Sequence, residues 1–240
     1  MTKWLIFYII ICKISNVAKS RLGKSKVSMK KTEIKKYIAI AIDIINILLV
    51  GLSVLSFFED GGNGNIVVKD ALCFGRFTND SNILMAITSL IPLVFLFKSE
   101  VPEVVVVLKF VGTVAVTVTL LTVLLFLGPT HGYDGMFDGV FLYLHLICPL
   151  LSIISLYLPE TPKPLPKFAW LYGTLPVVVY GSVYLIMVLI TEKWPDFYGF
   201  NRGGFWYISL PAMFLCSALL SFIMAFIRKF RIKSKGNFDE

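Results

Sequence analysis

The chain has 240 residues, of which 57% are apolar and 16% are charged, and its formal net charge at pH 7 is +8. A mean hydropathy of +0.79 excludes a water-soluble enzyme, because a soluble domain of this length cannot hide so much apolar surface. The positive charge does not indicate a nucleic-acid partner, since the basic residues gather at the two ends of the chain and do not interleave with aromatic residues on one surface.

Residues 1–36 form a basic segment that we expect at the cytoplasmic membrane surface. The run 4–12 is apolar but too short to span a bilayer, and Lys13 follows it at once. A signal peptide cleaved near Ala18 would place eight basic residues outside, against the charge bias described below. The start of the chain is therefore either a surface-lying segment or an extension upstream of a true start at Met29, and the sequence does not separate the two.

The rest of the chain is dominated by long apolar runs. A bilayer core of about 30 Å needs roughly 20 apolar residues of helix, and six runs approach or exceed that length. They are 37–58, 77–97, 104–128, 140–158, 168–191 and 206–227. We therefore predict an all-α integral membrane protein with six transmembrane helices in one bundle, covering 37–227, and a basic cytoplasmic tail at 228–240.

Basic residues are distributed unevenly between the segments that connect these runs. Eighteen Lys and Arg residues fall in the termini and loops of one side, and four fall in the loops of the other. Because the side with the excess is cytoplasmic in membrane proteins, we expect both termini inside and a bacterial plasma membrane as the location.

Two ionisable residues lie in the cytoplasmic halves of the predicted spans. Asp43 falls about 9 Å into the first span, and we expect it to be isolated there. Lys109 falls about a turn and a half into the third span, so its stem is long enough for the ammonium group to snorkel to the inner headgroups. An ionisable residue inside a membrane is a functional candidate by default.

Polar residues crowd the outer start of the second span. Thr78, Asn82, Met85 and Ser89 recur at helical spacing, so this mostly polar stripe should face protein and not lipid. One interpretation of Thr78 is a helix N-cap, because Thr-Asn-Asp-Ser is good capping chemistry. The other is a catalytic nucleophile.

His145 lies about 8 Å below the outer edge of the fourth span. Pro149 follows four residues later and removes the amide that would bond the carbonyl of residue 145. The histidine either hydrogen-bonds a neighbouring helix or acts as a general base for Thr78. Thr78 is at the outer start of the second span, so the two residues can lie at a similar depth. No residue on its own helix can orient the ring, and we expect the outer aspartates, including Asp196, to be solvated charges.

Aromatic residues are dense at the outer end of the fifth span. Tyr180 and Tyr184 lie one turn apart, and Trp194 and Phe197 follow in the next loop. They form either an interfacial belt or a lid over an outer cavity. Together with Ser81 and Asn82, we take Tyr180, Tyr184 and Trp194 as candidates for a substrate pocket or for oxyanion donors.

Two motifs resemble those of a known family. Phe77-Thr78-Asn79-Asp80-Ser81-Asn82-Ile83-Leu84 resembles the Phe-Thr-x-x-Ser-Asn-x-Leu signature of bacterial relatives of the androgen-induced membrane hydrolases, and 144–149 resembles their His-x-x-x-Pro element. The resemblance covers roughly 37–227. It implies a threonine hydrolase that cleaves fatty acid esters of hydroxy fatty acids, with Thr78 and His145 as its essential residues. The outer loop reads Trp-Pro-Asp-Phe-Tyr-Gly-Phe where many relatives have a Tyr-Pro-Tyr-Pro-Phe type of sequence, so acyl specificity does not carry over.

Two functions remain open on the sequence. The first is a membrane-embedded hydrolase of lipid or fatty-acyl esters, with Thr78 as nucleophile and His145 as base in an outer pocket. The second is a non-enzymatic multi-pass protein, either a small-solute transporter that uses Asp43 and His145 as proton or cation sites or a partner for another membrane protein. A transport path needs polar groups through the midplane, whereas the polar cluster in this sequence is concentrated near the outer side.

The four cysteines give no sign of a metal or a disulfide. They are widely scattered without metal-ligand spacing, and only Cys73 falls in an expected external segment. We therefore expect small apolar side chains at these positions, no metal and no cofactor.

Overall fold

The computed structural model describes residues 31–62, 65–70, 72–95, 101–158 and 164–236. The chain divides into two units, 1–34 and 35–240, and the features that follow lie in the second unit, apart from residues 31–34 of the first helix. Our interpretations of residues 1–28 lie outside the described residues.

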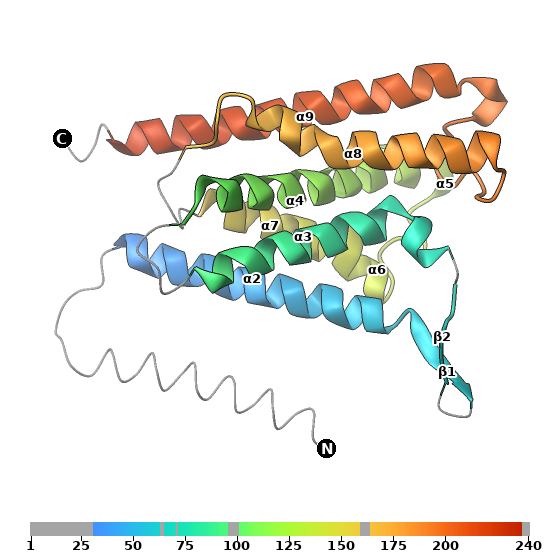
Figure 1. The fold of residues 1–240 in the computed structure, drawn as a ribbon, viewed down its shortest axis with the longest axis horizontal. Coiled ribbons are helices and arrows are strands. Elements are labelled where there is room, and N and C mark those ends of the chain that lie inside the picture. The colour runs from blue at the N-terminus through green and yellow to red at the C-terminus, as the bar shows by residue number, and fades with distance from the viewer. Residues whose placement is uncertain (1–30, 63–64, 71, 96–100, 159–163, 237–240) are drawn as a thin grey trace. The chain divides into compact units, whose positions relative to one another are not determined.

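The second unit is a bundle of antiparallel helices (Figure 1). They are α2 (Lys31–Leu55), α3 (Phe77–Val94), α4 (Glu103–Thr122), α7 (Cys148–Tyr157), α8 (Ala169–Leu185) and α9 (Trp206–Gly236), with the short α5 (Gly128–His131) and α6 (Val140–Leu142). Two 3-10 turns, η1 (Cys73–Gly75) and η5 (Arg202–Gly204), lie in the connections. The helix α9 continues through most of the predicted basic tail.

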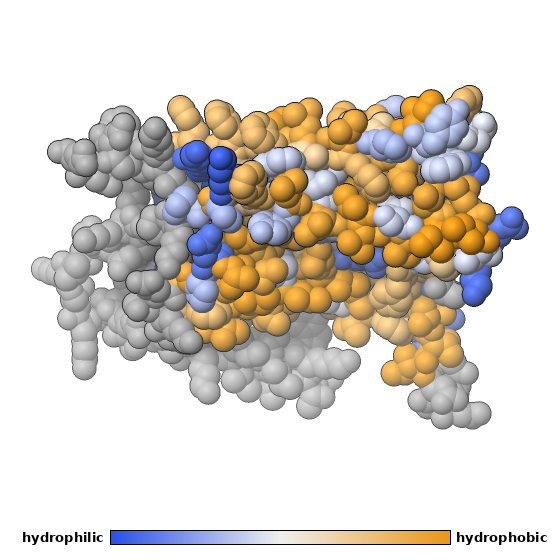
Figure 2. Space-filling view, turned by 45° about the horizontal axis from the view of Figure 1, so that its top comes forward, coloured by the Kyte–Doolittle hydropathy of each residue, from blue (hydrophilic) through white to orange (hydrophobic). Residues whose placement is uncertain are grey.

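Five of the described helical segments are long and apolar enough to cross a membrane. They are Ile34–Leu55, Glu103–His131, Val140–Tyr157, Ala169–Ile190 and Trp206–Arg231. The space-filling view shows apolar residues over the middle of the bundle and hydrophilic residues gathered towards its ends (Figure 2). This is the surface expected of an all-α integral membrane protein. The remaining long helix, α3, is not among the five, because polar residues fill its first turns.

A short β-hairpin follows α2 and was not predicted. Strand β1 (Phe58–Gly62) pairs antiparallel with β2 (Asn65–Val68), with an irregularity between Asp60 and Gly62. The β-branched run 66–68 favours this structure, but each strand is too short to stand out beside an apolar span. We call this end of the bundle the hairpin end and the opposite end, where α9 terminates, the basic end (Figure 1).

Three helices contain a wider π turn, and proline explains two of them. These turns are η2 (Val123–Leu127), η3 (Tyr143–Ile147) and η4 (Ile186–Ile190). Pro129 and Pro149 have no N–H for the carbonyl four residues earlier, so Gly128 and Cys148 bond five residues back instead. The third turn ends α8, where Thr191 N–H reaches the carbonyl of Ile186 at 3.0 Å.

Helix α4 lies at the centre of the packing. It contacts α3, α7, α8 and α9, and its membrane-length segment is 61% buried, the highest share among the five candidate spans. Two apolar clusters surround it. One contains Val50, Met85, Val116, Leu144 and Cys148, and the other contains Phe110, Val114, Leu156, Ala169 and Met224.

Gly112 permits the close approach of α3 and α4. A Cβ at this position would lie 2.0 Å from Oγ1 of Thr88 and 3.0 Å from the backbone Cα of Met85. We predict that Gly112→Ala lowers the free energy of unfolding by about 1–3 kcal/mol, as overpacking does elsewhere. Thermal unfolding in detergent measures this loss.

Gly51→Ala is the matched control, because nothing lies within 4 Å of the added Cβ on α2. Its unfolding temperature should stay unchanged or rise, since alanine is the better helix former. Equal losses in both variants would contradict the packing of α3 on α4.

Candidate functional site

The first turn of α3 is capped from a distant loop. Its N-cap residue, Arg76, makes no side-chain capping bond, and the N–H of Phe77 donates to the Tyr198 hydroxyl at 3.0 Å. Tyr198 is buried, and burial raises the pKa of its phenol above the ordinary value, so the hydroxyl stays neutral. Thr78 lies inside the helix and not at its cap, so the N-cap interpretation of Thr78 is wrong.

Asp196 organises the loop that carries Tyr198. Its carboxylate accepts hydrogen bonds from the Tyr184 hydroxyl at 2.7 Å and from the backbone N–H groups of Phe200 and Asn201 at 2.9 and 2.8 Å. We expected a solvated charge here, and that expectation is wrong. Three donors converge on one carboxylate and fold the loop back on itself.

The aromatic residues of this loop pack on one another and over the start of α3. Tyr184 contacts Trp194, Phe197 and Tyr198 through its ring, while the Tyr180 hydroxyl donates to the carbonyl of Gly75 at 2.8 Å. Contacts with protein on several sides are what a lid or rim requires. They differ from a simple interfacial belt, in which the rings face the headgroups.

The stripe Thr78, Asn82, Met85 and Ser89 is buried, as predicted. The side-chain amide of Asn82 donates to the carbonyl of Thr78 at 2.7 Å and to the carbonyl of Leu144 at 3.0 Å. Both of its N–H groups are therefore occupied, and Asn82 joins α3 to η3 instead of offering an oxyanion donor. None of the hydrogen bonds among the described residues involves the Thr78 hydroxyl.

Ser81 faces a different neighbour. Its hydroxyl donates to the carbonyl of Thr78 at 3.1 Å and lies 2.8 Å from the hydroxyl of Thr119 on α4. These contacts link the first turns of α3 to α4.

His145 is oriented by a backbone carbonyl. It lies in the π turn η3, and its Nδ1 is 2.7 Å from the carbonyl oxygen of Met136. A carbonyl only accepts, so Nδ1 carries a proton, and in the neutral imidazole the lone pair is then on Nε2. The ring of Phe141 stacks on the imidazole with centroids 5.4 Å apart.

The loop that supplies this carbonyl depends on glycine. Gly132, Gly135 and Gly139 all have positive φ angles, which other residues adopt at a cost. This orienting group could not be predicted from the sequence, because a backbone carbonyl belongs to every residue. Thr78 and His145 share no hydrogen bond in this structure, although Asn82 connects the turns that carry them.

A large cavity lies between α3, α4 and α8. It has a volume of about 1000 Å³ and is lined almost entirely by apolar side chains. Ser81, Tyr180 and Trp194 are among its lining residues, whereas Thr78, Asn82, His145 and Tyr184 are not.

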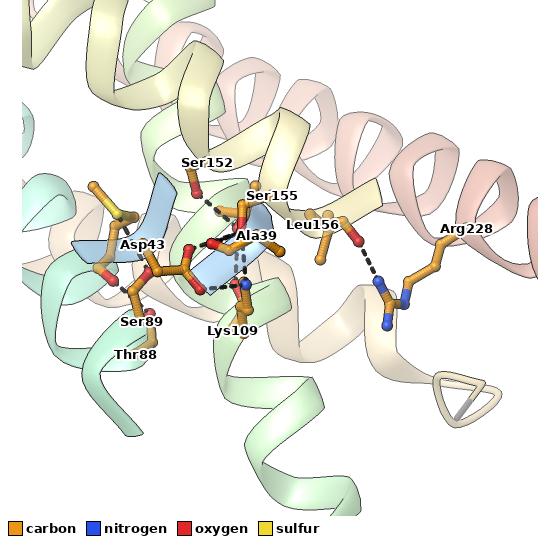
Figure 3. Close-up of polar contacts among 11 residues, drawn as sticks. Ala39, Asp43, Thr88, Ser89, Lys109, Ser152, Ser155, Leu156 and Arg228 are labelled. Carbon is orange, nitrogen blue, oxygen red and sulfur yellow. Dashed lines mark hydrogen bonds and ion pairs between the residues drawn. The ribbon is translucent and has the colours of Figure 1, made fainter. Parts of the chain in front are cut away.

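Towards the basic end, Asp43 and Lys109 form a buried ion pair (Figure 3). Lys109 Nζ lies 2.6 Å from Asp43 Oδ2 and 2.8 Å from the Ser155 hydroxyl, which donates to Asp43 Oδ1 at 2.8 Å. The two charged side chains are 7% and 1% exposed. Two expectations are therefore wrong: Lys109 does not snorkel to the headgroups, and Asp43 is not isolated. Pairing within the bundle removes the need for either group to reach water.

The buried polar groups continue along α4 beyond this pair. Thr113 and Thr117 follow Lys109 at intervals of four residues, and each hydroxyl donates to the carbonyl four residues before it. The Thr113 hydroxyl also lies 2.8 Å from that of Ser152 on α7. The expectation that polar groups concentrate near the outer side is therefore wrong, because buried hydroxyls extend through the middle of α4.

No metal-binding cluster of three or more His, Cys, Asp or Glu side chains occurs among the described residues. Cys73 and Cys148 are buried free thiols and Cys216 is an exposed one.

Comparison with known proteins gives no relative. No family model matches the chain, and no curated protein or solved structure is detectably similar to it. The family resemblance described above therefore rests on its two motifs and on the region 180–200 of this sequence.

Removing one member of the buried ion pair should be costly. We predict that Asp43→Asn lowers the free energy of unfolding by about 3–5 kcal/mol, because it leaves the Lys109 ammonium buried without its counter-charge. The double variant Asp43→Asn with Lys109→Met removes both charges and should recover most of that loss. Chemical unfolding in detergent measures both, and a double variant that is no more stable than Asp43→Asn would contradict the pairing.

Proposed function

We propose that this protein hydrolyses lipid esters within the membrane, with Thr78 as nucleophile and His145 as general base. The observation that carries the proposal is the state of His145. The Met136 carbonyl holds the proton on Nδ1 and leaves Nε2 as a base, and a neutral, oriented imidazole of this kind is what activates a hydroxyl nucleophile. The resemblance of the two motifs to those of intramembrane threonine hydrolases supports the same assignment.

The reaction needs only these two side chains, the ester and water. Thr78 Oγ attacks the ester carbonyl while Nε2 of His145 takes the hydroxyl proton, and the imidazolium then protonates the departing alcohol oxygen. Water attacks the acyl-threonine with His145 again as base. This step releases the carboxylic acid and restores the Thr78 hydroxyl. The Met136 carbonyl stabilises the ring orientation in both steps, a role that a carboxylate fills in other triads.

The contacts around Thr78 hold its backbone and leave its hydroxyl without a hydrogen bond to another described residue. Its hydroxyl is not committed to another described residue, while its carbonyl is held by Asn82 and Ser81. The backbone is thereby fixed and the side chain is left available, which is the usual form of a preorganised nucleophile.

The proposal includes six spans with both termini cytoplasmic. In this proposal α3 is a span in addition to the five candidate segments, and it is the second along the chain. It lies antiparallel to α4 and packs along it (Figure 1), and its polar stripe is buried against protein. The excess of basic residues at the basic end supports a cytoplasmic position for that end, so that the hairpin end faces outwards.

Cysteine labelling tests this orientation. In a chain freed of its native cysteines, we predict that a membrane-impermeant maleimide added outside labels Lys69→Cys near the hairpin and leaves Lys167→Cys at the basic end unlabelled. Both lysines are exposed on the protein surface, so a difference in labelling between the two positions reports the side of the membrane and not burial within the protein. The opposite pattern would reverse the orientation.

Substitution of the two catalytic residues tests the chemistry. We predict that Thr78→Ala abolishes lipid-ester hydrolysis and that His145→Ala lowers kcat by about 10²-fold to 10⁴-fold, the range for a lost general base. Hydrolysis of a long-chain ester by purified protein, compared at equal folded amount, gives the measurement.

Ser81→Ala is the matched control for the lost hydroxyl. It removes a hydroxyl one turn from Thr78 that is already bonded to Thr119, and activity should remain. Full lipid-ester hydrolysis by folded Thr78→Ala would contradict the assignment of Thr78 as nucleophile. If only Ser81→Ala lost hydrolysis, Ser81 would be the nucleophile instead.

The buried Asp43–Lys109 pair favours a second candidate, a transporter of protons or small cations. Buried charge and hydroxyls along α4 are the groups that such a path uses. The double variant Asp43→Asn with Lys109→Met separates the two functions. A hydrolase should retain ester cleavage because this pair lies towards the basic end, away from Thr78, whereas a transporter that uses the pair should lose ion flux in proteoliposomes.

A further inference from the structure

The cavity between α3 and α8 is a groove closed at the hairpin end. There the ring of Phe77 contacts the ring of Tyr180 with centroids 5.0 Å apart, and the Tyr180 hydroxyl bonds the carbonyl of Gly75. Trp194 packs against Gly75 at the same level. From this closed end the groove extends along α4, whose residues Val104, Val107, Leu108 and Val111 form its floor.

The walls of the groove are suited to an acyl chain. Leu84 of α3 and Leu175, Val179 and Val183 of α8 line its sides, and these helical segments belong to the apolar part of the bundle. A volume of about 1000 Å³ lies at the upper end of the range for small-ligand sites, roughly 300–1000 Å³. A lipid chain enters such a groove from the bilayer without crossing water.

The charged groups of the groove decide which headgroup fits. Asp80 lines it near the closed end, Glu103 lines it at the opposite end on the first turn of α4, and no lysine or arginine is among its lining residues. The Asp80 carboxylate makes no hydrogen bond or ion pair with any other described residue. The nearest cationic residue along the chain, Arg76, is already paired with Asp70 at 2.9 Å.

An anionic headgroup at the hairpin end would therefore meet the Asp80 carboxylate without a compensating cation, which is unfavourable. A headgroup with a primary ammonium would supply the donors that Asp80 lacks. Asp80 lies in the first turn of α3, where the helix dipole favours a negative charge.

We propose that this groove binds an aminophospholipid from the leaflet at the hairpin end, with one acyl chain along α4 and the ammonium group at Asp80. The site is separate from the proposed reaction. Phe77, Asp80, Ser81 and Leu84 face the groove, whereas the buried stripe that begins at Thr78 lies on another face of α3. The lipid is a bound ligand and need not be the ester that is cleaved.

Fluorescence quenching of Trp194 tests the proposal in the Thr78→Ala protein, so that hydrolysis plays no part. The protein is placed in phosphatidylcholine vesicles that contain a small fraction of either phosphatidylethanolamine or phosphatidylglycerol with brominated chains. The difference between this protein and its Trp194→Phe variant isolates the signal of Trp194 from those of the other tryptophans.

We expect the brominated ethanolamine lipid to reach half-quenching at about a tenfold lower fraction than the glycerol lipid, the effect of one charge-assisted hydrogen bond. Asp80→Asn should remove this preference, whereas Asp134→Asn, a loss of the same charge at an exposed position outside the groove, should keep it. Val111→Phe should reduce quenching by both lipids, and Leu215→Phe, on the exposed side of α9, should not.

Two results would overturn the assignment. Equal quenching by the two lipids, or equal effects of Asp80→Asn and Asp134→Asn, would exclude ammonium recognition at Asp80. Unchanged quenching in Val111→Phe would exclude an acyl chain in the groove.

Discussion

A bilayer cannot solvate the polar side chains of α4, so each must find its partner inside the bundle. Lys109 meets this constraint through Asp43 on α2 and Ser155 on α7, and Thr113 meets it through Ser152. Nearer the hairpin end, Thr119 contacts Ser81 on α3. These bonds fix the positions of α2, α3 and α7 along the central helix, and apolar packing then fills the space between them.

The proposed catalytic residues depend on that arrangement. Once α3 is held against α4, Asn82 reaches the carbonyl of Leu144 and joins α3 to the π turn that carries His145. The turn itself exists because Pro149 cannot donate a backbone hydrogen bond. The Tyr198 hydroxyl then caps the N-terminus of α3, and the Met136 carbonyl orients the imidazole of His145. Loops from two different connections thus complete a site that no single helix contains.

The long apolar helices and the buried stripe from Thr78 to Ser89 could be predicted from the sequence, because hydropathy and helical spacing follow directly from residue type. The sequence did not predict the Asp43–Lys109 pair, since partners 66 positions apart are not visible in one sequence and snorkelling satisfies the same lysine equally well. Asp196 was misjudged because the three donors that converge on it include two backbone amides. The Met136 carbonyl carries no residue-specific signal at all.

The most direct test of the proposed chemistry is the position of a covalent adduct. The purified protein is treated with a lipid-like fluorophosphonate, digested, and the modified residue is located by mass spectrometry. The account predicts phosphonylation of Thr78, reduced strongly in His145→Ala because the hydroxyl then lacks its base. An adduct on another residue, or an ester-cleaving protein that forms none at Thr78, would contradict it.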